Sequence, residues 1–132
     1  MSDFSDLIPQ EVSCVYFTNE RLGHIRNEHT FTGDDMIKGS WLNEFINFDR
    51  NIFFNTFLLL ALESPVSVTA NEQGGYRLTA EVPFIVGRTG AFDGFGGAAN
   101  SFTNRYEVII NQRAGDELPQ CFKVRTSFPV GN

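Results

Sequence analysis

Two histidines and the arginine between them are the side chains in this sequence best suited to chemistry. His24 and His29 lie in the segment 21–29, with Arg26 between them. Histidine titrates near neutral pH, so one imidazole can act as the base and the other as the acid when a phosphodiester is cleaved through its 2′-hydroxyl. A guanidinium can hold the phosphate with two hydrogen bonds and stabilise the charge of the transition state. RNA cleavage is therefore one candidate chemistry.

The five-residue separation of the two histidines limits how they can act together. On a regular helix their rings point about 140° apart, so they converge on one substrate only if His29 lies at or beyond the end of the helix. In the alternative interpretation one histidine caps the helix C-terminus, where the helix dipole favours a cation, and the other is a surface residue. Zinc-binding pairs on a helix prefer a step of about four residues. Because no third ligand is evident either, no metal or other cofactor is expected.

The front half of the chain predicts helices that could position these residues. After a short strand at residues 12–17, Thr18 or Asn19 can cap a helix that runs to about His29. A second helix is expected to begin at Asp34 or Asp35, with an apolar stripe at helical spacing. That stripe comprises Ile37, Trp41, Leu42 and Phe45. Residues 51–62 are apolar on nearly all sides, which predicts a central buried helix.

In the back half the period changes to the alternation typical of strands. The predicted strands are residues 66–69, 76–86, 105–111 and 121–130, with a loop at 87–104. The side chains expected to face inward are Leu78, Ala80, Val82 and Phe84, then Tyr106, Val108 and Ile110, then Phe122, Val124, Thr126 and Phe128. Helices followed by strands predict an α+β fold with an antiparallel sheet. Residues 1–132 are expected to form one domain, with a helical part at about 18–63 and a sheet part at about 66–130.

The other face of the predicted sheet mixes cations, carboxylates and hydroxyls. Alternate side chains of a strand point to opposite faces. This face is expected to carry Arg77, Thr79, Glu81, Arg105, Glu107, Lys123, Arg125 and Ser127. It is either an ordinary solvated surface or a shallow site for an anion or a nucleotide.

Charge restricts the kinds of ligand that this face could bind. The net charge is −6, but residues 1–76 hold four basic and eleven acidic side chains, whereas residues 77–132 hold six basic and five acidic ones. A protein that coats duplex nucleic acid would be strongly basic, because neutralising phosphates supplies most of that affinity. Any contact with RNA is therefore expected to be local and to lie on the second half.

Targeting signals and cysteines bear on the compartment. The acidic N-terminal segment 1–6 is unlike the basic start of a signal peptide, and the longest apolar stretch, residues 57–62, is too short to cross a bilayer. Cys14 and Cys121 lie far apart in sequence and are expected to be reduced, mostly buried thiols. The expected location is the cytoplasm, or the cytoplasm of a target cell into which the protein is delivered.

Two segments of the sequence resemble a known family. The first is residues 15–29, which read Val-Tyr-Phe-Thr-Asn-Glu-Arg-Leu-Gly-His-Ile-Arg-Asn-Glu-His. It is similar to the short strand and the helix reading roughly His-Ile-x-x-Arg-His of phage- and toxin-type nucleases, which belong to the barnase–EndoU–colicin D–RelE-like superfamily. The second is residues 124–129, Val-Arg-Thr-Ser-Phe-Pro, which stand where the family's final strand often carries Thr or Ser before an aromatic residue. The resemblance implies N-terminal helices packed on one face of a curved antiparallel sheet formed by the C-terminal half.

The resemblance also implies a function and a set of site residues. The implied activity is that of a metal-independent endoribonuclease, often acting on tRNA and frequently a toxin neutralised by an immunity partner. His24 and His29 would be the catalytic pair. Arg125, Thr126 and Ser127 would contact the phosphate or the transition state, and Arg26, Arg105 and Lys123 are further candidates for binding RNA phosphates.

Two alternatives remain open at this point. The same fold could serve as a binding module without catalysis, such as an immunity protein or a phage accessory domain. The acidic helical half favours this second function, because an acidic face is complementary to a basic nuclease. Three aromatic residues of the loop could stack an RNA base or could fold back onto the core. These are Phe92, Phe95 and Phe102.

Overall fold

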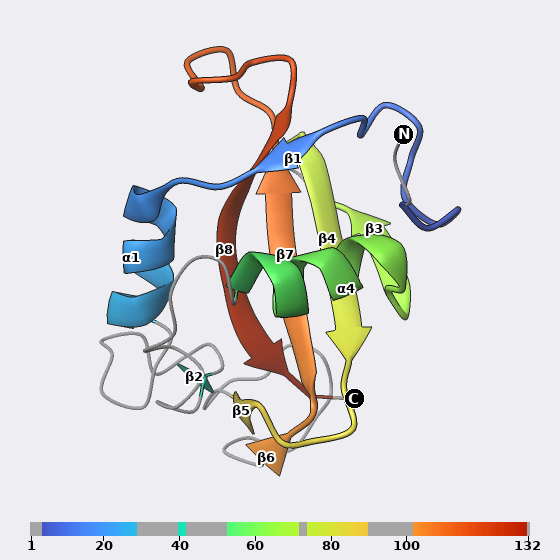
Figure 1. The fold of residues 1–132 in the computed structure, drawn as a ribbon, viewed down its shortest axis with the longest axis vertical. Helices are drawn as coiled ribbons and strands as arrows, with labels where there is room; N and C mark the ends of the chain where they lie inside the picture. The colour runs from blue at the N-terminus through green and yellow to red at the C-terminus, as the bar shows by residue number, and fades with distance from the viewer. Residues whose placement is uncertain (1–3, 29–39, 42–52, 72–73, 90–101, 132) are drawn as a thin grey trace.

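The computed structural model describes residues 4–28, 40–41, 53–71, 74–89 and 102–131 (Figure 1). A five-stranded sheet in the order β1-β8-β7-β4-β3 dominates them. Its strands are β1 (Val15–Tyr16), β3 (Ser67–Ala70), β4 (Gly75–Glu81), β7 (Arg105–Asn111) and β8 (Phe122–Val130). A smaller sheet, in the order β2-β5-β6, joins β2 (Ser40–Trp41), β5 (Gly87–Arg88) and β6 (Phe102–Thr103). The helical segments are α1 (Asn19–Glu28), the π-helix η1 (Phe53–Leu58) and α4 (Leu59–Glu63).

The predicted α+β class is confirmed, but the prediction of a purely antiparallel sheet is wrong. β1 pairs in parallel with β8, with Val15 opposite Phe122, so the sheet is mixed and includes a strand from the N-terminal part. The alternation of apolar residues along a strand is the same for either direction, so the pattern could not reveal this pairing. The second predicted helix is also wrong at Trp41, which lies in β2 opposite Gly87. The other residues of its stripe lie outside the described part of the chain.

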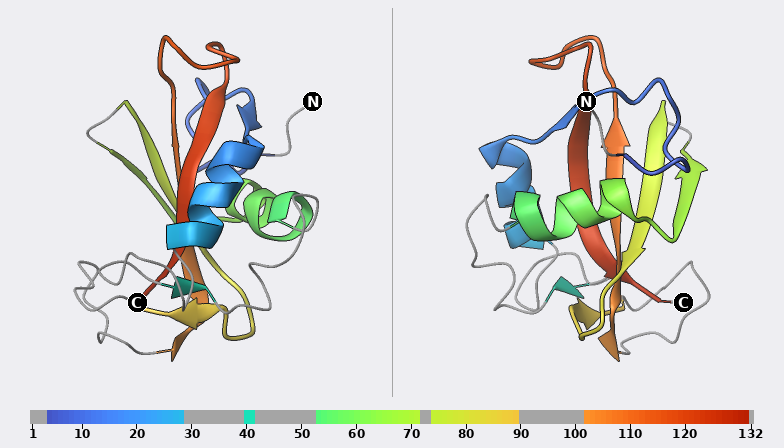
Figure 2. Two further views of the ribbon diagram at one scale, coloured as in Figure 1. Left: turned by 90° about the vertical axis from the view of Figure 1, so that its left-hand side faces the viewer. Right: turned by 45° about the vertical axis from the view of Figure 1, so that its right-hand side comes forward.

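The helical segments contact the sheet through apolar side chains. Thr18 Oγ1 accepts a hydrogen bond from the backbone N–H of Arg21 (3.3 Å), which caps α1 as predicted. Leu22 and Ile25 of α1 are buried, and α1 contacts β8. Figure 2 (left) shows α4 to one side of the sheet and α1 in front of its β8 edge. The strand side chains that do not face the core point to the other side of the sheet.

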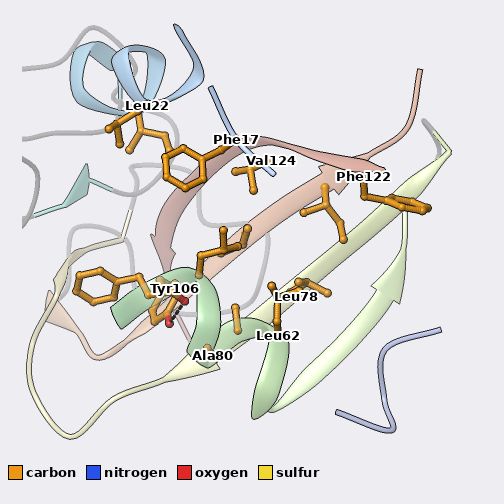
Figure 3. Close-up of a cluster of buried hydrophobic side chains, with 14 of the residues drawn as sticks. Phe17, Leu22, Leu62, Leu78, Ala80, Tyr106, Phe122 and Val124 are labelled. Atoms are coloured by element: carbon orange, nitrogen blue, oxygen red, sulfur yellow. Dashed lines mark hydrogen bonds between the residues drawn. The ribbon is translucent and has the colours of Figure 1, made fainter. Parts of the chain in front are cut away.

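An aromatic cluster lies at the centre of the core. Trp41, Phe57 and Tyr106 pack with ring centroids 5.0 to 5.4 Å apart. The Tyr106 hydroxyl donates a hydrogen bond to the Phe57 carbonyl (2.6 Å), which fixes η1 over β7. Around it, the core draws on α1, α4, β4, β7 and β8 (Figure 3). The labelled side chains are Phe17, Leu22, Leu62, Leu78, Ala80, Tyr106, Phe122 and Val124.

A β-bulge at Arg125 overturns part of the predicted face assignment. Ile109 is opposite Thr126 and Ile110 is opposite Val124, so Arg125 is the extra residue on β8. An extra residue reverses the alternation of side chains beyond it. Ser127, predicted to face outward, is therefore opposite the core residue Val108 and fully buried. Thr126, predicted to face inward, lies on the opposite face, as does Phe128.

A second face assignment fails at the end of β4. Leu78, Ala80 and Val82 are buried as predicted, but Phe84 is 42% exposed. The strand ends at Glu81, five residues earlier than the alternation indicated, so the period no longer applies to Phe84. The apolar alternation in the sequence continues beyond Glu81, the last residue of β4 that pairs with β7.

The expectation of two reduced cysteines is wrong, because Cys14 and Cys121 form a disulfide. The backbone N–H of Phe122 donates to the Cys14 carbonyl (2.9 Å), so the parallel contact of β1 with β8 brings the two cysteines together. They are 107 residues apart in sequence, a distance at which spacing carries no information on pairing.

Reduction of this disulfide is expected to lower the free energy of unfolding by about 2–4 kcal/mol, because the cross-link restricts a long loop of the unfolded chain. Urea unfolding with and without a dithiol reductant measures the effect. The double variant Cys14→Ser/Cys121→Ser should match the reduced protein and be insensitive to reductant. An unchanged wild-type midpoint in reductant would contradict a stabilising role for this bond.

Candidate functional site

An arginine-rich hollow of about 680 Å³ lies on the face of the sheet away from the core. It is lined by Arg21, His24, Thr69, Ala70, Asn71, Arg77, Ile109, Arg113, Arg125 and Thr126. Four of these residues are arginines, and none of the described residues that line it carries a carboxylate. Cations gathered in a concave surface raise the local concentration of an anionic ligand. This composition therefore suits an anion, although the whole chain is acidic.

The floor of the hollow is a single row of side chains across four strands. Thr69 of β3 is opposite Arg77 of β4, Arg77 is opposite Ile109 of β7, and Ile109 is opposite Thr126 of β8. Residues paired in this way point to the same face of a sheet. The bulge at Arg125 puts Thr126 in this row, because without it the register of Val124 with Ile110 would place Arg125 opposite Ile109.

One wall of the hollow comes from α1. Arg21 donates from Nε (2.8 Å) and from Nη2 (2.6 Å) to the backbone carbonyl of Arg125, the bulged residue. His24 follows Arg21 by three residues, so the two side chains lie on the same flank of the helix. The buried neighbours Leu22 and Ile25 hold the opposite flank against the core. The helix is thus docked on β8 with its polar flank at the hollow.

The Arg125 guanidinium is held by two side chains at the base of the β7–β8 loop. Its Nη2 lies 2.7 Å from both carboxylate oxygens of Asp116, and its Nε donates to Asn111 Oδ1. The two charged side chains are 12% and 6% exposed. Among the described residues, none accepts a hydrogen bond from Nη1. Arg125 therefore has a fixed orientation and one amino group available for a ligand.

A second ion pair holds Arg77, the arginine in the floor of the hollow. Glu107 on β7 is fully buried, and its Oε1 lies 3.1 Å from Nε of Arg77, whose side chain is 41% exposed. A buried carboxylate needs a cation close by. The pair therefore holds the stem of Arg77 against the sheet while part of its guanidinium reaches the hollow.

Acidification is expected to release Arg125. Burial alone would raise the pKa of the Asp116 carboxyl, but hydrogen bonds from Arg125 and from the Arg113 N–H, with the charges of Arg125 and Lys123, outweigh it and lower this pKa. A pKa lowered by folding contributes stability above the unfolded value, about 3.9, and that stability is lost as the pH falls through the folded value.

The free energy of unfolding of wild type should thus exceed that of Asp116→Asn at pH 7, and the difference should shrink below about pH 4. Urea unfolding of both proteins between pH 7 and pH 3 measures it. A difference that stays constant across this range would show that the ionisation of Asp116 does not stabilise the fold.

The structure brings together three of the residues predicted for the site. His24, Arg125 and Thr126 all line the hollow, although they come from opposite ends of the chain. His29 lies outside the described residues. Arg26 belongs to the described backbone of α1, and its side chain is outside the description.

Three other predicted residues do not line the hollow. Ser127 is buried on the core face, where its hydroxyl donates to the Glu107 carbonyl (2.8 Å). Lys123 is on the correct face but is buried, with Nζ 3.0 Å from the Glu117 carboxylate. Arg105 lies at the far end of β7 and pairs with Glu81 (3.2 Å). The bulge explains why Ser127 faces the core and not the hollow. Lys123 and Arg105 are engaged in ion pairs away from the hollow.

The sequence prediction missed several residues of the hollow. Arg21 could have been found, because it precedes His24 by one helical turn and so shares its flank. Arg77 was expected on this face but not in the site. Arg113, Thr69 and Asn71 had no signal, because they belong to turns or to an edge strand, whose place relative to the site depends on the tertiary fold.

No protein-family model, curated protein or solved structure matches this chain. The similarity to the nuclease superfamily therefore rests on residues 15–29 and 124–129 alone. Within the described residues, no helix is long and apolar enough to span a membrane. The same residues contain no group of three or more His, Cys, Asp or Glu side chains that could hold a metal ion.

Proposed function

We propose that this chain is an endoribonuclease of the toxin or phage type, which binds an RNA phosphodiester in the arginine-rich hollow. The observation that supports the proposal is the meeting of His24, Arg125 and Thr126 in one concave surface. These residues come from two segments of the sequence about a hundred positions apart.

The side chains of the hollow suit cleavage through the 2′-hydroxyl. An imidazole takes the proton of the 2′-hydroxyl, whose oxygen attacks phosphorus, and the bond from phosphorus to the 5′-oxygen breaks as that oxygen is protonated. The products are a 2′,3′-cyclic phosphate and a 5′-hydroxyl. His24 carries one of the two proton transfers, and His29 is proposed for the other. Arginine donors stabilise the charge on the phosphoryl oxygens.

The scaffold proposed for this activity has the helices packed on one face of a curved sheet and the RNA on the other. The target is single-stranded RNA or a loop such as those of tRNA, where bases are unpaired. An immunity protein is a proposed partner. The disulfide is typical of proteins that have passed through an oxidising compartment. It therefore favours delivery into a target cell's cytoplasm over permanent residence there.

The alternative is a non-catalytic binding module, such as an immunity protein or a phage accessory domain. The excess of acidic over basic side chains in residues 1–76 supports it, because such a surface can bind a basic protein. The two functions differ in whether RNA is consumed.

The test is incubation of purified protein with a defined single-stranded RNA in a chelator. The expected products carry 2′,3′-cyclic phosphate and 5′-hydroxyl ends, which mass spectrometry identifies. The same sequence with a 2′-deoxy sugar at every position is the matched control, and it should remain intact. Binding of both strands without cleavage of either would support the binding module instead. If the protein neither cuts nor binds the RNA, the endoribonuclease proposal fails and only a module that binds a basic protein remains.

A further inference from the structure

We infer that the hollow binds at least two phosphodiester groups of one nucleic-acid strand, laid across the β-strands, and that it recognises the sugar–phosphate backbone rather than the bases. This inference deepens the proposed function and rests on it. It follows from the spacing of the cations along the floor and from the absence of Phe, Tyr and Trp among the described lining residues.

The cations are arranged at two separate ends of the hollow. At one end Arg21 and His24 of α1 lie beside Arg125 at the bulge of β8. At the other end Arg77 projects from β4, next to Thr69 on the edge strand β3. Strand β7 separates β8 from β4. Neighbouring strands are about 4.8 Å apart, so the two ends are separated by about 10 Å.

This distance separates the backbones, and the two guanidiniums are in addition held toward different ends of β7, that of Arg125 by Asn111 and that of Arg77 by Glu107. Hydrogen bonds to an ion need donor–acceptor distances of about 2.7–2.9 Å, so a phosphate bound closely at Arg125 leaves Arg77 for a second one. A strand with successive phosphates can place one at each end. Its long axis would then run along the row Thr69–Arg77–Ile109–Thr126, across the strands rather than parallel to them.

The middle of the row is apolar and small. Ile109 lies between Arg77 and Thr126 and is partly exposed. It offers a surface for a sugar, but an aliphatic side chain provides no π-face. Base-selective sites on single strands rely largely on aromatic stacking and on hydrogen bonds to base edges. None of the described lining residues is Phe, Tyr or Trp, and the imidazole of His24 is the one described aromatic ring in the hollow. Affinity is therefore expected to depend on the number of phosphates and little on base identity.

The experiment measures binding of deoxyoligonucleotides, which lack the 2′-hydroxyl and so cannot be cleaved by the proposed chemistry. Inorganic phosphate, a mononucleotide and 5′-phosphorylated oligomers of two, three and six thymidines or adenosines are the probes, at one low salt concentration. Affinity should rise by roughly tenfold between the mononucleotide and the trinucleotide, since each added ionic hydrogen bond contributes about that factor. It should be similar for thymidine and adenosine oligomers and should fall with salt.

A carboxylate at the far end of the row tests the geometry. Thr69 is exposed on the edge strand, so Thr69→Glu adds a negative charge there without disturbing the core. This substitution should remove the increase in affinity from the mononucleotide to the trinucleotide. It should change the affinity for the mononucleotide by less than about twofold. Gln10→Glu, an exposed residue away from the hollow, makes the same change in net charge and should leave the gain intact.

Three outcomes would overturn the inference. Equal affinity for mononucleotide and trinucleotide would reduce the hollow to a single-phosphate site, and RNA cleavage could still occur there. A strong preference for one base would contradict backbone recognition. An equal loss in Thr69→Glu and Gln10→Glu would show that only net charge matters. Binding without RNA cleavage would preserve the inference about the ligand and remove the catalytic proposal.

Discussion

Replacing His24 with alanine is expected to slow RNA cleavage by on the order of 100- to 10,000-fold, the usual contribution of one general acid or base. The imidazole lies on the polar flank of α1 at the hollow, one turn from Arg21. The apolar flank of the helix would keep its buried residues Leu22 and Ile25 in the variant. Catalysis should therefore fall much more than stability or RNA binding.

Single-turnover cleavage of a defined RNA measures this loss, and affinity for the matching deoxy strand shows whether binding survives. Glu20→Ala is the matched control, because Glu20 is an exposed residue of the same helix that does not line the hollow. It should cleave at nearly the wild-type rate. If His24→Ala also cleaves at that rate, His24 takes no part in proton transfer and the proposed mechanism is wrong.

Replacing Arg125 with alanine is expected to have the largest effect on stability within the hollow. Asp116 has a side chain that is 6% exposed and has both carboxylate oxygens 2.7 Å from Arg125. Removing one partner of a buried pair leaves the other charge uncompensated, which costs about 3 kcal/mol. The variant also loses the hydrogen bond to Asn111. The β7–β8 loop and the phosphate site should both be weakened.

Urea unfolding and binding of a phosphorylated oligonucleotide together test this double role. The variant Arg125→Ala/Asp116→Asn should be more stable than Arg125→Ala, because it no longer buries a lone carboxylate. It should nevertheless bind the oligonucleotide as weakly as Arg125→Ala does. If restored stability also restores binding, Arg125 is a structural residue only and does not contact the ligand.

Local patterns determined much of the fold in advance. Helix α1 begins at Asn19 after the predicted cap Thr18, and β7 spans Arg105–Asn111 as predicted, with Tyr106, Val108 and Ile110 buried. These elements are set by interactions between residues close in sequence, such as a cap or an alternation of apolar residues. The same patterns placed His24 on a helix and Arg125 on the last strand.

Tertiary contacts decided where these elements meet. Arg21 bonds to the backbone of a residue 104 positions away, and the parallel contact of β1 with β8 pairs two cysteines 107 positions apart. No property of the intervening residues encodes either contact locally. Both contacts depend on how the apolar surface of the whole chain is buried. A short segment of the sequence cannot predict this.

The bulge on β8 shows the same division within a single strand. The sequence determined that residues 122–130 alternate and would form a strand, but the extra residue at Arg125 arises only from pairing with β7. That pairing sends Ser127 to the core and Thr126 to the hollow. The types of the site residues were thus determined by the sequence. The face on which each one lies was decided by the tertiary structure, because a single-residue shift of register exchanges the two faces of a strand.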